Sequence, residues 1–343
     1  MHAVFFLPNS SGYKDRIALL QEVSRLIGAV TLLVGKNDLS EDVVESDTFK
    51  VKEVGFVSGA RLWNLWKASR RLSTIRNVDV IHDTSGNLIL TFFALKLRRD
   101  RPVLVTSFFA LEKWRIKNVW EKSGYSTLKL LINQTTRKMY LGAFVQRVMS
   151  MLSDYVILQA PGLINRLTDY AGVDEDKVNV LANNVDTDFW KVDPNSVKIS
   201  AKSQILYVGG LDHSRGIFSL IEALKMIREM GLNVSLRLVV KEGMLGKQLI
   251  EEYLQKKGVV DHVIFSNRLT REQMRAAYNE SDLLVYQTIN DGSPRVVLEA
   301  LSCGLPVVAS HHPGINILDP VGEFIQFTKY ADIDSMVKAI IEI

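Results

Sequence analysis

The sequence predicts two α/β domains in tandem, each with a parallel β-sheet covered by helices. Short apolar runs rich in β-branched residues alternate with helical patterns along the whole chain, which is typical of βαβ units. The alternation stops in a polar stretch over 183–203 and then restarts. The length of 343 residues also favours two domains over one.

In the first half, five apolar runs are each followed by polar residues or glycine, and each predicts a strand. They are AVFFL (3–7), AVTLLVG (29–35), DVIHD (79–83), VLVTSFF (103–109) and YVILQ (155–159). Helical patterns lie between them, at RIALLQEVSRLI (16–27) and LWNLWKASRRLSTI (62–75). The segment from about 112 to 152 is long, basic and predicted to be mostly helical.

The second half repeats the alternation, with strands that are nearly continuous in apolar residues, as buried parallel strands are. The predicted strands are QILYVGG (204–210), VSLRLVV (234–240), HVIFS (262–266), DLLVYQT (282–288) and LPVVAS (305–310). The predicted helices are 217–230, 246–258, 271–280 and 293–304. In such sheets ligands bind at the carboxyl ends of the strands, so two domains predict a site in the cleft between them.

The composition is that of a soluble globular protein, with 47% hydrophobic and 23% charged residues. No apolar run approaches the ~18 residues that a membrane span needs. The N-terminus, MHAVFFLPNS, has no basic region and too short an apolar stretch for a signal peptide, and it predicts a first strand. Cys303 is the only cysteine, which excludes an intrachain disulfide and favours a reducing cytoplasm.

The net charge of +4 hides an asymmetry, because residues 1–160 carry a net charge of +9 and residues 161–343 one of −5. Residues 96–147 hold 12 basic and 3 acidic side chains. One interpretation is a solvated helical face. Another is a docking surface for anionic membrane and a lipid-linked acceptor, because Trp114, Trp120 and Tyr125 are interleaved with the charges. Nucleic acid is not expected, because no recognition motif accompanies the charge.

The stretch TINDGSPRVVLEALSCGLPVVAS (288–310) places Glu299 inside an otherwise apolar helical pattern. Ser293 and Pro294 are a good N-cap and first helical residue, so the helix N-terminus follows Asp291 and Gly292 at the end of a strand. There its N–H groups and positive dipole end favour an anion. A buried carboxylate needs strong donors, and vicinal ribose or sugar hydroxyls would serve. The alternative is that Glu299 lies at the helix surface, paired with a lysine.

A second stretch, LYVGGLDHSRGIFSL (206–220), runs from a strand through two glycines and a short polar loop into a helix. This arrangement cradles phosphates, because glycines allow close approach and Arg215 adds a positive charge near the helix N-terminus. It is not the dinucleotide GxGxxG pattern, since 209–214 is GGLDHS. The alternative is a tight strand–helix turn with a solvated arginine.

Together these stretches resemble the retaining, nucleotide-sugar-dependent glycosyltransferases of the GT-B fold, a family 4-like group that includes sucrose-phosphate synthases and mannosyltransferases. Its hallmark is two acids eight positions apart, followed by an LEAMACG-P-VV-AS-like run. Here they are Asp291 and Glu299, followed by LEALSCGLPVVAS. YVGGLDHSRG, LTREQMRAAYNESDLLVYQT and VNVLANNVDTDFW also match. The similarity is specific over about 155–318 and diffuse over 1–150.

The resemblance implies two Rossmann-like, doubly wound domains that face each other across a cleft. Residues 1–190 would bind the acceptor, 191–203 would be the linker, and 204–343 would bind the nucleotide sugar. The implied reaction moves a sugar from a UDP- or GDP-linked donor to a hydroxyl of a glycan, lipid-linked or small-molecule acceptor, with retention. No cofactor and no metal are expected. The implied location is cytoplasmic, with the peripheral membrane contact through 96–147 as one interpretation.

The family's functional residues can be placed on matching positions of this chain. Glu299 would hold the ribose hydroxyls, Asp291 would hold hydroxyls of the donor sugar, and Arg215 stands where the family has a phosphate-binding lysine. The remaining donor-binding positions are Gly209, Gly210, Gly292, Ser293, Pro294, Arg295, Val296, Asn267 and Arg268. On the acceptor side, Gly12 matches the glycine loop after the first strand, and His82 lies in the family's histidine-bearing loop.

The chain also departs from the family pattern. Gly210 stands where arginine is frequent, and Asp291 is one methylene shorter than the usual glutamate. Thr84 and Phe108 stand where histidines are common, so the acceptor side is altered. Family members usually continue beyond the position of Ile343 with a helix that crosses back to the first domain. Two alternatives follow: a nucleotide-sugar epimerase on the same fold, and a non-catalytic subunit that binds a nucleotide sugar.

Overall fold

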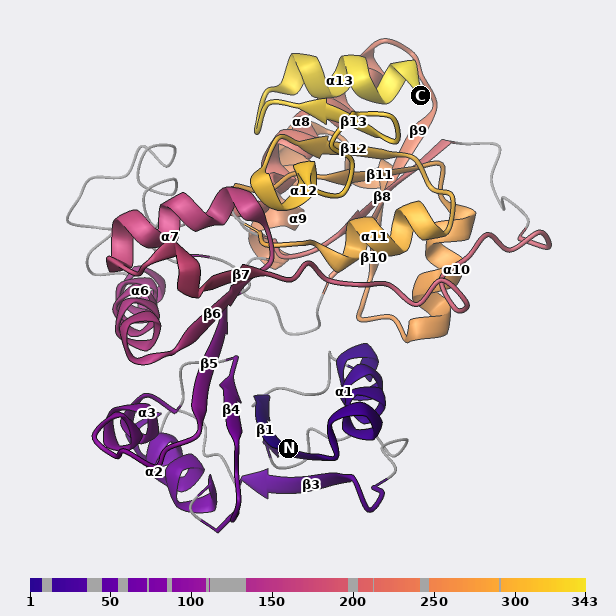
Figure 1. The fold of residues 1–343 in the computed structure, drawn as a ribbon. Coiled ribbons are helices and arrows are strands. Elements are labelled where there is room, and N and C mark those ends of the chain that lie inside the picture. Colours follow the sequence, from indigo (N-terminus) through magenta and orange to yellow (C-terminus); the bar gives the residue numbers. More distant parts are fainter. Residues whose placement is uncertain are drawn as a thin grey trace. The chain divides into compact units, whose positions relative to one another are not determined.

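The structure is a computed structural model that describes most of the chain. The described residues are 1–7, 14–35, 45–54, 61–72, 74–84, 88–108, 111, 134–196, 203–211, 213–240, 247–289 and 291–343. They form two compact units, one up to residue 181 and one from residue 182 onward. Each unit is an α/β layer structure built on a parallel sheet (Figure 1). The predicted fold class is therefore confirmed.

The first unit contains a seven-stranded sheet of order β3-β2-β1-β4-β5-β6-β7, in which every neighbouring pair is parallel. Its strands are β1 (His2–Leu7), β2 (Ala29–Gly35), β3 (Phe49–Val54), β4 (Val80–Asp83), β5 (Val103–Phe108), β6 (Tyr155–Leu158) and β7 (Val178–Val180). Its described helices are α1 (Lys14–Ile27), α2 (Arg61–Leu72), α3 (Ile89–Lys96), α6 (Gln134–Leu152) and α7 (Ile164–Ala171).

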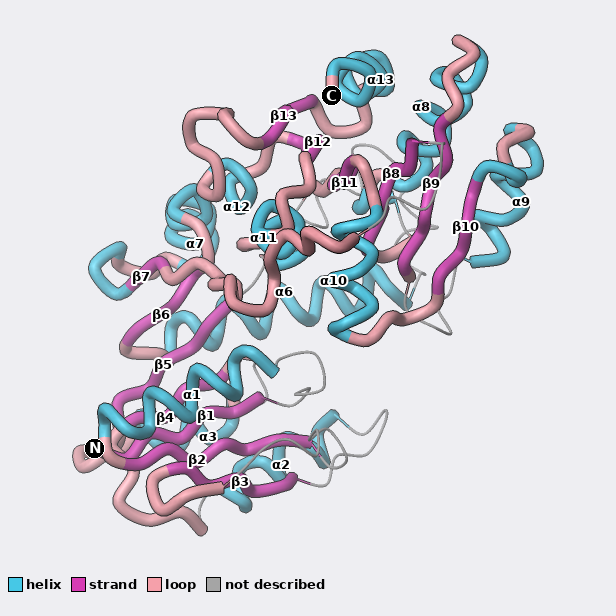
Figure 2. Tube along the Cα trace, turned by 90° about the vertical axis from the view of Figure 1, so that its right-hand side faces the viewer, coloured by secondary structure: helices cyan, strands magenta, loops and turns pink. Residues whose placement is uncertain are grey.

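The two faces of this sheet are covered by different helices. Right-handed crossovers place α1 on one face, because β2 lies on one side of β1. They place α2, α3, α6 and α7 on the other face, because the chain then steps the opposite way through β4, β5, β6 and β7 (Figure 2). Buried Leu7, Ile17, Leu20, Leu32 and Phe49 form a core between α1 and the sheet.

The second unit contains a six-stranded parallel sheet of order β10-β9-β8-β11-β12-β13. Its strands are β8 (Ser203–Val208), β9 (Val234–Val239), β10 (Val263–Ser266), β11 (Leu283–Tyr286), β12 (Val307–Ser310) and β13 (Ile325–Thr328). Its helices are α8 (Ile217–Glu229), α9 (Lys247–Lys257), α10 (Arg271–Glu280), α11 (Arg295–Ser302), α12 (Pro313–Asn316) and α13 (Ile333–Glu342). The order is that of a doubly wound nucleotide-binding sheet.

Two apolar cores sandwich the second sheet. One joins α8, α9 and α13 to the strands through side chains such as Leu220, Leu236 and Met336. The other lies under α10 and α11 and includes Tyr278 and Val297. Trp190 is buried in this second core, so the segment that follows residue 181 packs as part of the second unit.

Most predicted strands agree with the structure to within a few residues, and β2 and α10 agree at both ends. Three of the described strands were not predicted from the sequence. β3 has the sequence FKVKEV and lies at a sheet edge, β7 has three residues, and β13 is IQFT. None of the three carries the continuous apolar run of a central parallel strand, because an edge or short strand is not buried on every side.

Candidate functional site

The candidate site lies at the carboxyl ends of β8 and β11 in the second unit. These two strands are neighbours, and the chain leaves them toward opposite edges of the sheet. That reversal of strand order is where doubly wound sheets bind ligands, because the loops that follow the two strands diverge. Both sequence motifs therefore come to the same place: 206–220 follows β8, and 288–310 follows β11.

The first loop turns sharply at glycines. Gly209 and Gly210 follow β8, and the hydroxyl of Tyr207 donates to the carbonyl oxygen of Gly210. Gly216 caps α8 with φ +66°, and a Cβ there would overlap the Cβ of Gln287. A glycine is therefore required at 216, both for its left-handed backbone and for its contact with the segment after β11.

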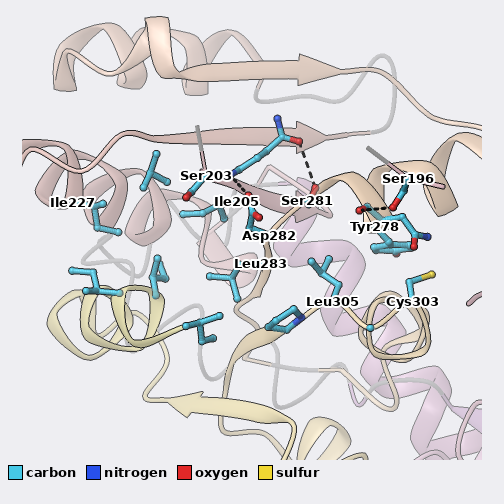
Figure 3. Close-up of a pocket in the computed structure, with 18 of the residues that line it drawn as sticks. Ser196, Ser203, Ile205, Ile227, Tyr278, Ser281, Asp282, Leu283, Cys303 and Leu305 are labelled. Carbon is cyan, nitrogen blue, oxygen red and sulfur yellow. Dashed lines mark hydrogen bonds between the residues drawn. The ribbon is translucent and has the colours of Figure 1, made fainter. Parts of the chain in front are cut away.

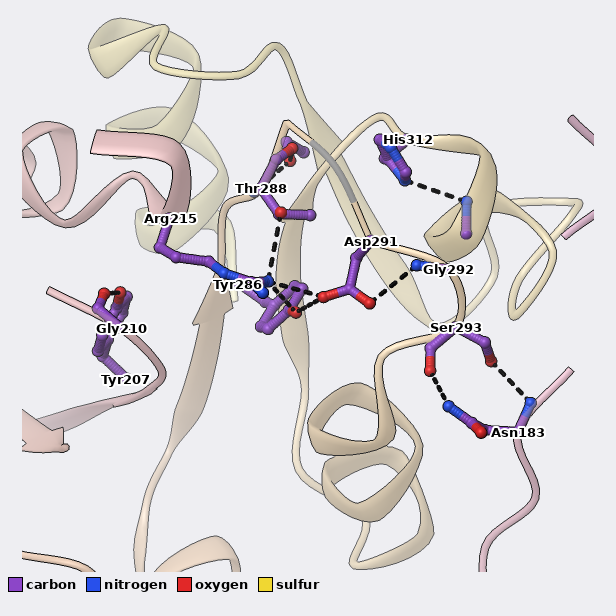
Figure 4. Close-up of polar contacts among 12 residues, drawn as sticks. Asn183, Tyr207, Gly210, Arg215, Tyr286, Thr288, Asp291, Gly292, Ser293 and His312 are labelled. Atoms are coloured by element: carbon purple, nitrogen blue, oxygen red, sulfur yellow. Dashed lines mark hydrogen bonds and ion pairs between the residues drawn. The ribbon is translucent and has the colours of Figure 1, made fainter. Parts of the chain in front are cut away.

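Arg215 is held at the centre of a polar cluster (Figure 4). Its Nη1 donates to the Tyr286 hydroxyl at 2.9 Å, to the Thr288 hydroxyl at 3.4 Å and to Asp291 Oδ2 at 2.7 Å. The Tyr286 hydroxyl donates to the same Asp291 oxygen at 2.7 Å. The other oxygen, Oδ1, accepts from the N–H of Gly292 at 2.9 Å. The cluster joins the β8 motif to the β11 motif through one carboxylate.

This cluster fixes the charge of Arg215. Burial alone would lower the pKa of the guanidinium, but the hydrogen-bonded Asp291 carboxylate beside it raises that pKa above its usual value. Burial and the nearby Asp291 carboxylate raise the pKa of Tyr286 well above that of a free phenol. Arg215 therefore stays cationic and Tyr286 stays a neutral donor at any ordinary pH. A fixed cation at this position could receive an anionic group such as a diphosphate.

Glu299 lies on α11 with a side chain that is only 12% exposed. Its Oε2 accepts from the hydroxyl of Tyr278 at 3.0 Å, and its Oε1 lies 3.6 Å from Nη2 of Arg295. With so little of its side chain exposed, Glu299 does not lie at the helix surface as the alternative interpretation had it. Tyr278 is fully buried, and its pKa is raised well above that of a free phenol by burial and by Glu299. The carboxylate is thus oriented by a fixed donor from α10.

The expected N-cap at Ser293 is wrong. α11 begins at Arg295, and Pro294 is its N-cap, without a side-chain capping bond. The Ser293 hydroxyl instead accepts from the N–H of Asn183 at 3.2 Å, and the Ser293 carbonyl accepts from Asn183 Nδ2 at 2.5 Å (Figure 4). The buried serine is therefore used to hold the segment after residue 181, which the local pattern could not reveal.

The other predicted donor residues divide into two groups. Gly292, Arg295 and Val296 lie with Asp291 at the start of α11. The backbone of Gly314 packs directly against that of Gly292, because a Cβ added to Gly314 would overlap the carbonyl oxygen of Gly292. Asn267 and Arg268 are exposed and follow β10, which is two strands away from β8. The structure brings the first group to the cluster and leaves the second at the sheet's edge.

The histidine pair that precedes α12 has a structural role. Nδ1 of buried His312 accepts from the N–H of Gly314 at 3.1 Å and caps α12. The ring of His311 is stacked on Phe327, with centroids 4.7 Å apart. Across the described residues, no group of three or more histidine, cysteine, aspartate or glutamate side chains is arranged to hold a metal ion.

The predicted acceptor-side residues belong to the first unit. His82 lies on β4, with Nε2 2.5 Å from the Ser107 hydroxyl and its ring against Phe5. Thr84 donates its hydroxyl to the carbonyl of Phe6 at 2.9 Å. Phe108 is buried at the end of β5. Gly12 lies outside the described residues, as do Trp114, Trp120 and Tyr125.

A pocket of about 740 Å³ in the second unit lies at the opposite edge of the sheet (Figure 3). It is lined by the first residues of β8 and β11, including Ser203, Gln204 and Leu283, and by Leu305 before β12. No predicted donor residue lines it. Since doubly wound sheets bind ligands at the carboxyl edge, pocket size does not identify the donor site.

Sequence reasoning missed three side chains that orient the predicted ones. Tyr286 is the last residue of β11, Thr288 follows it, and Tyr278 comes from α10. Tyr286 and Thr288 could have been found, because polar side chains that end a buried parallel strand face the ligand edge. Tyr278 gave no signal, because a tyrosine in an amphipathic helix normally belongs to the core.

Comparisons with known proteins find similarity to glycosyltransferases. Residues 188–343 match the family model described as "Glycosyl transferases group 1". An uncharacterized glycosyltransferase of Methanocaldococcus jannaschii is 27% identical over 183 residues, which cover 49% of this chain and 46% of that protein. The matched part thus spans less than half of the relative's own length.

Two solved structures are similar to the chain over its whole length. Sucrose-phosphate synthase from Thermosynechococcus elongatus superposes with a TM-score of 0.79 at 15% identity, covering 100% of this chain and 89% of that one. Anabaena HepE in complex with UDP-glucose superposes with a TM-score of 0.73 at 16% identity, with the same coverage. At these identities the likeness establishes the fold.

Proposed function

We propose that the protein transfers a sugar from a nucleoside-diphosphate donor to an acceptor hydroxyl, which is supported by the match of residues 188–343 to the group 1 glycosyltransferase model and by the GT-B fold. The observation that carries the proposal is the polar cluster at the carboxyl ends of β8 and β11. It places a fixed cation, Arg215, against Asp291, and a buried carboxylate, Glu299, on the helix that follows.

The assigned roles follow from the donors and acceptors at each position. Arg215 would bind the diphosphate, because its charge is permanent and its other guanidinium nitrogen atoms carry further donors. Asp291 would accept from sugar hydroxyls while Tyr286 and Arg215 hold its carboxylate. Glu299 would accept from two ribose hydroxyls while Tyr278 holds Oε2. Gly209, Gly210 and Gly292 would allow the backbone to approach the ligand.

The chemistry needs charge stabilisation of a departing diphosphate more than a strong base. Arg215 and the N-terminal end of α11 would supply positive potential at that position. Retention of the anomeric configuration is part of the proposal. In it, a leaving phosphate oxygen accepts the proton of the acceptor hydroxyl on the same face of the sugar. This scheme requires neither a metal nor a cofactor.

The proposed partners follow from the same scheme. The donor is UDP- or GDP-linked, and the HepE complex with UDP-glucose supports the UDP form. The acceptor is a glycan, a lipid-linked molecule or a small molecule, bound by the first unit near His82. The proposed location is cytoplasmic, with peripheral contact with an anionic membrane. None of the helices within the described ranges has the length and apolar character of a membrane span.

The donor site is tested by thermal shift with UDP, GDP, ADP and their common sugar conjugates, with NAD as a control ligand. A nucleotide at 100 times its Kd stabilises the protein by ~2.7 kcal/mol, which raises Tm by several degrees. We expect one nucleotide family to stabilise the wild type and not Glu299→Ala. Glu323→Ala, which removes an exposed glutamate of the same unit, is the matched control. No shift with any nucleotide would refute the donor site.

Transfer is tested by product analysis with the nucleotide sugar found in that panel. Arg215→Ala should lower turnover by a factor of about 10² to 10³, and Lys256→Ala, an exposed position on α9, should leave it unchanged. Unchanged turnover in Arg215→Ala would refute the assignment. NMR of the anomeric proton tests retention. A changed sugar without acceptor would identify an epimerase, and nucleotide binding without turnover would identify a non-catalytic subunit.

A further inference from the structure

The helix layer of the first unit exposes an apolar surface on two neighbouring helices. α3 lies between α2 and α6 on one face of the sheet. Side chains exposed to between 47% and 77% project from α3 and its C-cap, and from α6. We call them the α3/α6 face, which comprises Leu90, Phe93, Leu97, Leu141, Phe144 and Met151.

The spacing shows that these residues form one stripe on each helix. On α3 they recur at intervals of three and four, and on α6 at intervals of three and seven, which keeps them on one side of a helix. The opposite side of each helix faces the sheet, where Phe92 and Met149 are buried. Each helix therefore has an apolar side toward the core and a second apolar side toward solvent. Adjacent exposed apolar side chains of this kind mark an interaction surface.

The charged residues of α2, α3 and α6 have a single sign. By sequence, α2 carries four basic residues, α3 one and α6 three, and none of the three helices contains aspartate or glutamate. The helix on the other face of the sheet, α1, mixes both signs (KDRIALLQEVSRLI). Two acids that follow α3 and α6 in sequence are paired with cations, Asp100 with Arg98 and Asp154 with Lys96 and Arg101. A solvated helix layer normally mixes both signs.

The border of the face with α2 carries an aromatic residue and a cation together. Trp66 is half-exposed, and the guanidinium carbon of Arg70 lies 5.3 Å from its ring centroid. A pocket of about 800 Å³ between α2 and α3 lies beside it. Its lining includes apolar Leu72 and Leu95 together with Arg98. Tryptophan with arginine is the pair that anchors proteins at the boundary between lipid headgroups and acyl chains.

We propose that the α3/α6 face, together with Lys67, Arg70 and Arg71 of α2, docks the protein on an anionic lipid bilayer. Aliphatic and aromatic side chains would enter the acyl boundary, while the surrounding cations would contact headgroup phosphates. A second copy of the chain fits less well, because two faces of the same sign repel. Nucleic acid fits less well, because the exposed Leu and Met side chains have neither a charge nor a hydrogen-bond donor for a phosphate backbone. The inference deepens the membrane contact of the proposed function and rests on that contact, not on sugar transfer.

The experiment is cosedimentation of the full chain with vesicles of phosphatidylcholine alone or mixed equally with phosphatidylglycerol. We expect binding to the anionic vesicles only, weakening as salt is raised. Arg70→Gln with Arg71→Gln should weaken partitioning by about 30-fold, from about fivefold for each lost cation. Phe93→Ser with Phe144→Ser should weaken it by about tenfold or more.

Matched control variants change the same chemistry elsewhere. Leu26→Ser with Met230→Ser removes exposed apolar side chains from α1 and from the second unit. Lys256→Gln with Lys329→Gln removes two exposed cations of the second unit. Both controls should bind vesicles as the wild type does. Near-UV circular dichroism and Tm establish that every variant is folded.

Three results would overturn the proposal. The first is no binding to anionic vesicles. The second is binding to a DNA fragment that the arginine variant loses and the phenylalanine variant keeps, without vesicle binding. The third is a dimer in solution that only the phenylalanine variant dissociates. The nucleotide thermal shift is measured on the same variants. In these variants, weakened vesicle binding with an intact nucleotide shift is the expected result. In the wild type, a nucleotide shift without vesicle binding would refute only the surface, and vesicle binding without a nucleotide shift would refute only the donor site.

Discussion

Gly216→Ala offers a direct test of how the glycine-containing loop between β8 and α8 is built. Gly216 has φ +66°, and its added Cβ would overlap the Cβ of Gln287 in the segment after β11. Gly258, which follows α9 in the same unit, has φ +69° and nothing within 4 Å of an added Cβ. The two substitutions share the backbone cost and differ in the contact.

The magnitudes follow from that difference. A left-handed backbone costs an alanine about 1 to 2 kcal/mol at either position. Alanine also removes some entropy of the unfolded chain, by a similar amount at both sites, so this effect cancels in the comparison. Overpacking against Gln287 adds about 1 to 3 kcal/mol at position 216 alone. We therefore expect Gly216→Ala to lower the free energy of unfolding by about 1 to 3 kcal/mol more than Gly258→Ala does.

The assay is urea unfolding of both variants and the wild type, followed by circular dichroism, with the free energy extrapolated to water. Nucleotide thermal shift on the same samples reports the site, because Arg215 directly precedes the substituted residue. Equal free energies for the two variants would refute the inferred contact between the β8 and β11 loops. A nucleotide shift in Gly216→Ala as large as in the wild type would show that the loop geometry is not needed for binding.

Two further outcomes are expected. Tyr278→Phe removes the donor to Glu299 and should cost about 1.5 to 3 kcal/mol of stability. Urea unfolding measures that loss, and a smaller nucleotide thermal shift should accompany it; an unchanged shift would mean that Tyr278 does not orient the carboxylate. Burial alone would raise the pKa of Asp154, but bonds from Arg101 at 2.5 Å and from the Leu104 N–H hold it well below its usual range. The stabilisation is therefore complete above the unfolded pKa of about 3.9 and is lost as pH falls toward the folded pKa. Asp154→Asn should be less stable at neutral pH and should lose less stability between neutral pH and pH 3; equal losses would refute the linkage.

The fold was predictable wherever strands are central and buried. AVTLLVG contains one polar residue, and the strand within DLLVYQT is the fully buried run LLVY, because both faces of a parallel sheet are covered. The edge strand FKVKEV is half charged, so it lacks the continuous apolar run by which the predicted strands were identified. Likewise, the polar segment after residue 181 reads as a connection, yet Trp190 is buried among residues of the second core. That packing depends on partners distant in sequence.

The site was predictable where one short stretch of sequence contains both a strand–loop–helix connection and the charged side chain that the loop or helix carries. Arg215, Asp291 and Glu299 stand in such stretches, and the structure places them in the segments that follow β8 and β11. The start of α11 was predicted two residues too early, because the Ser293 hydroxyl binds Asn183 rather than the helix. A local pattern identifies a hydroxyl that can cap a helix, but not a distant competitor for it.

Two departures from the family pattern are connected by the structure. In the sequence, Arg215 in place of lysine and Asp291 in place of glutamate are separate changes, 76 residues apart. In the folded unit, the two side chains are in contact at 2.7 Å. A guanidinium reaches further than an ammonium group, and an aspartate is one methylene shorter than a glutamate. The longer cation therefore meets the shorter acid, and Tyr286 binds both, so the two departures from the family pattern occur at one contact.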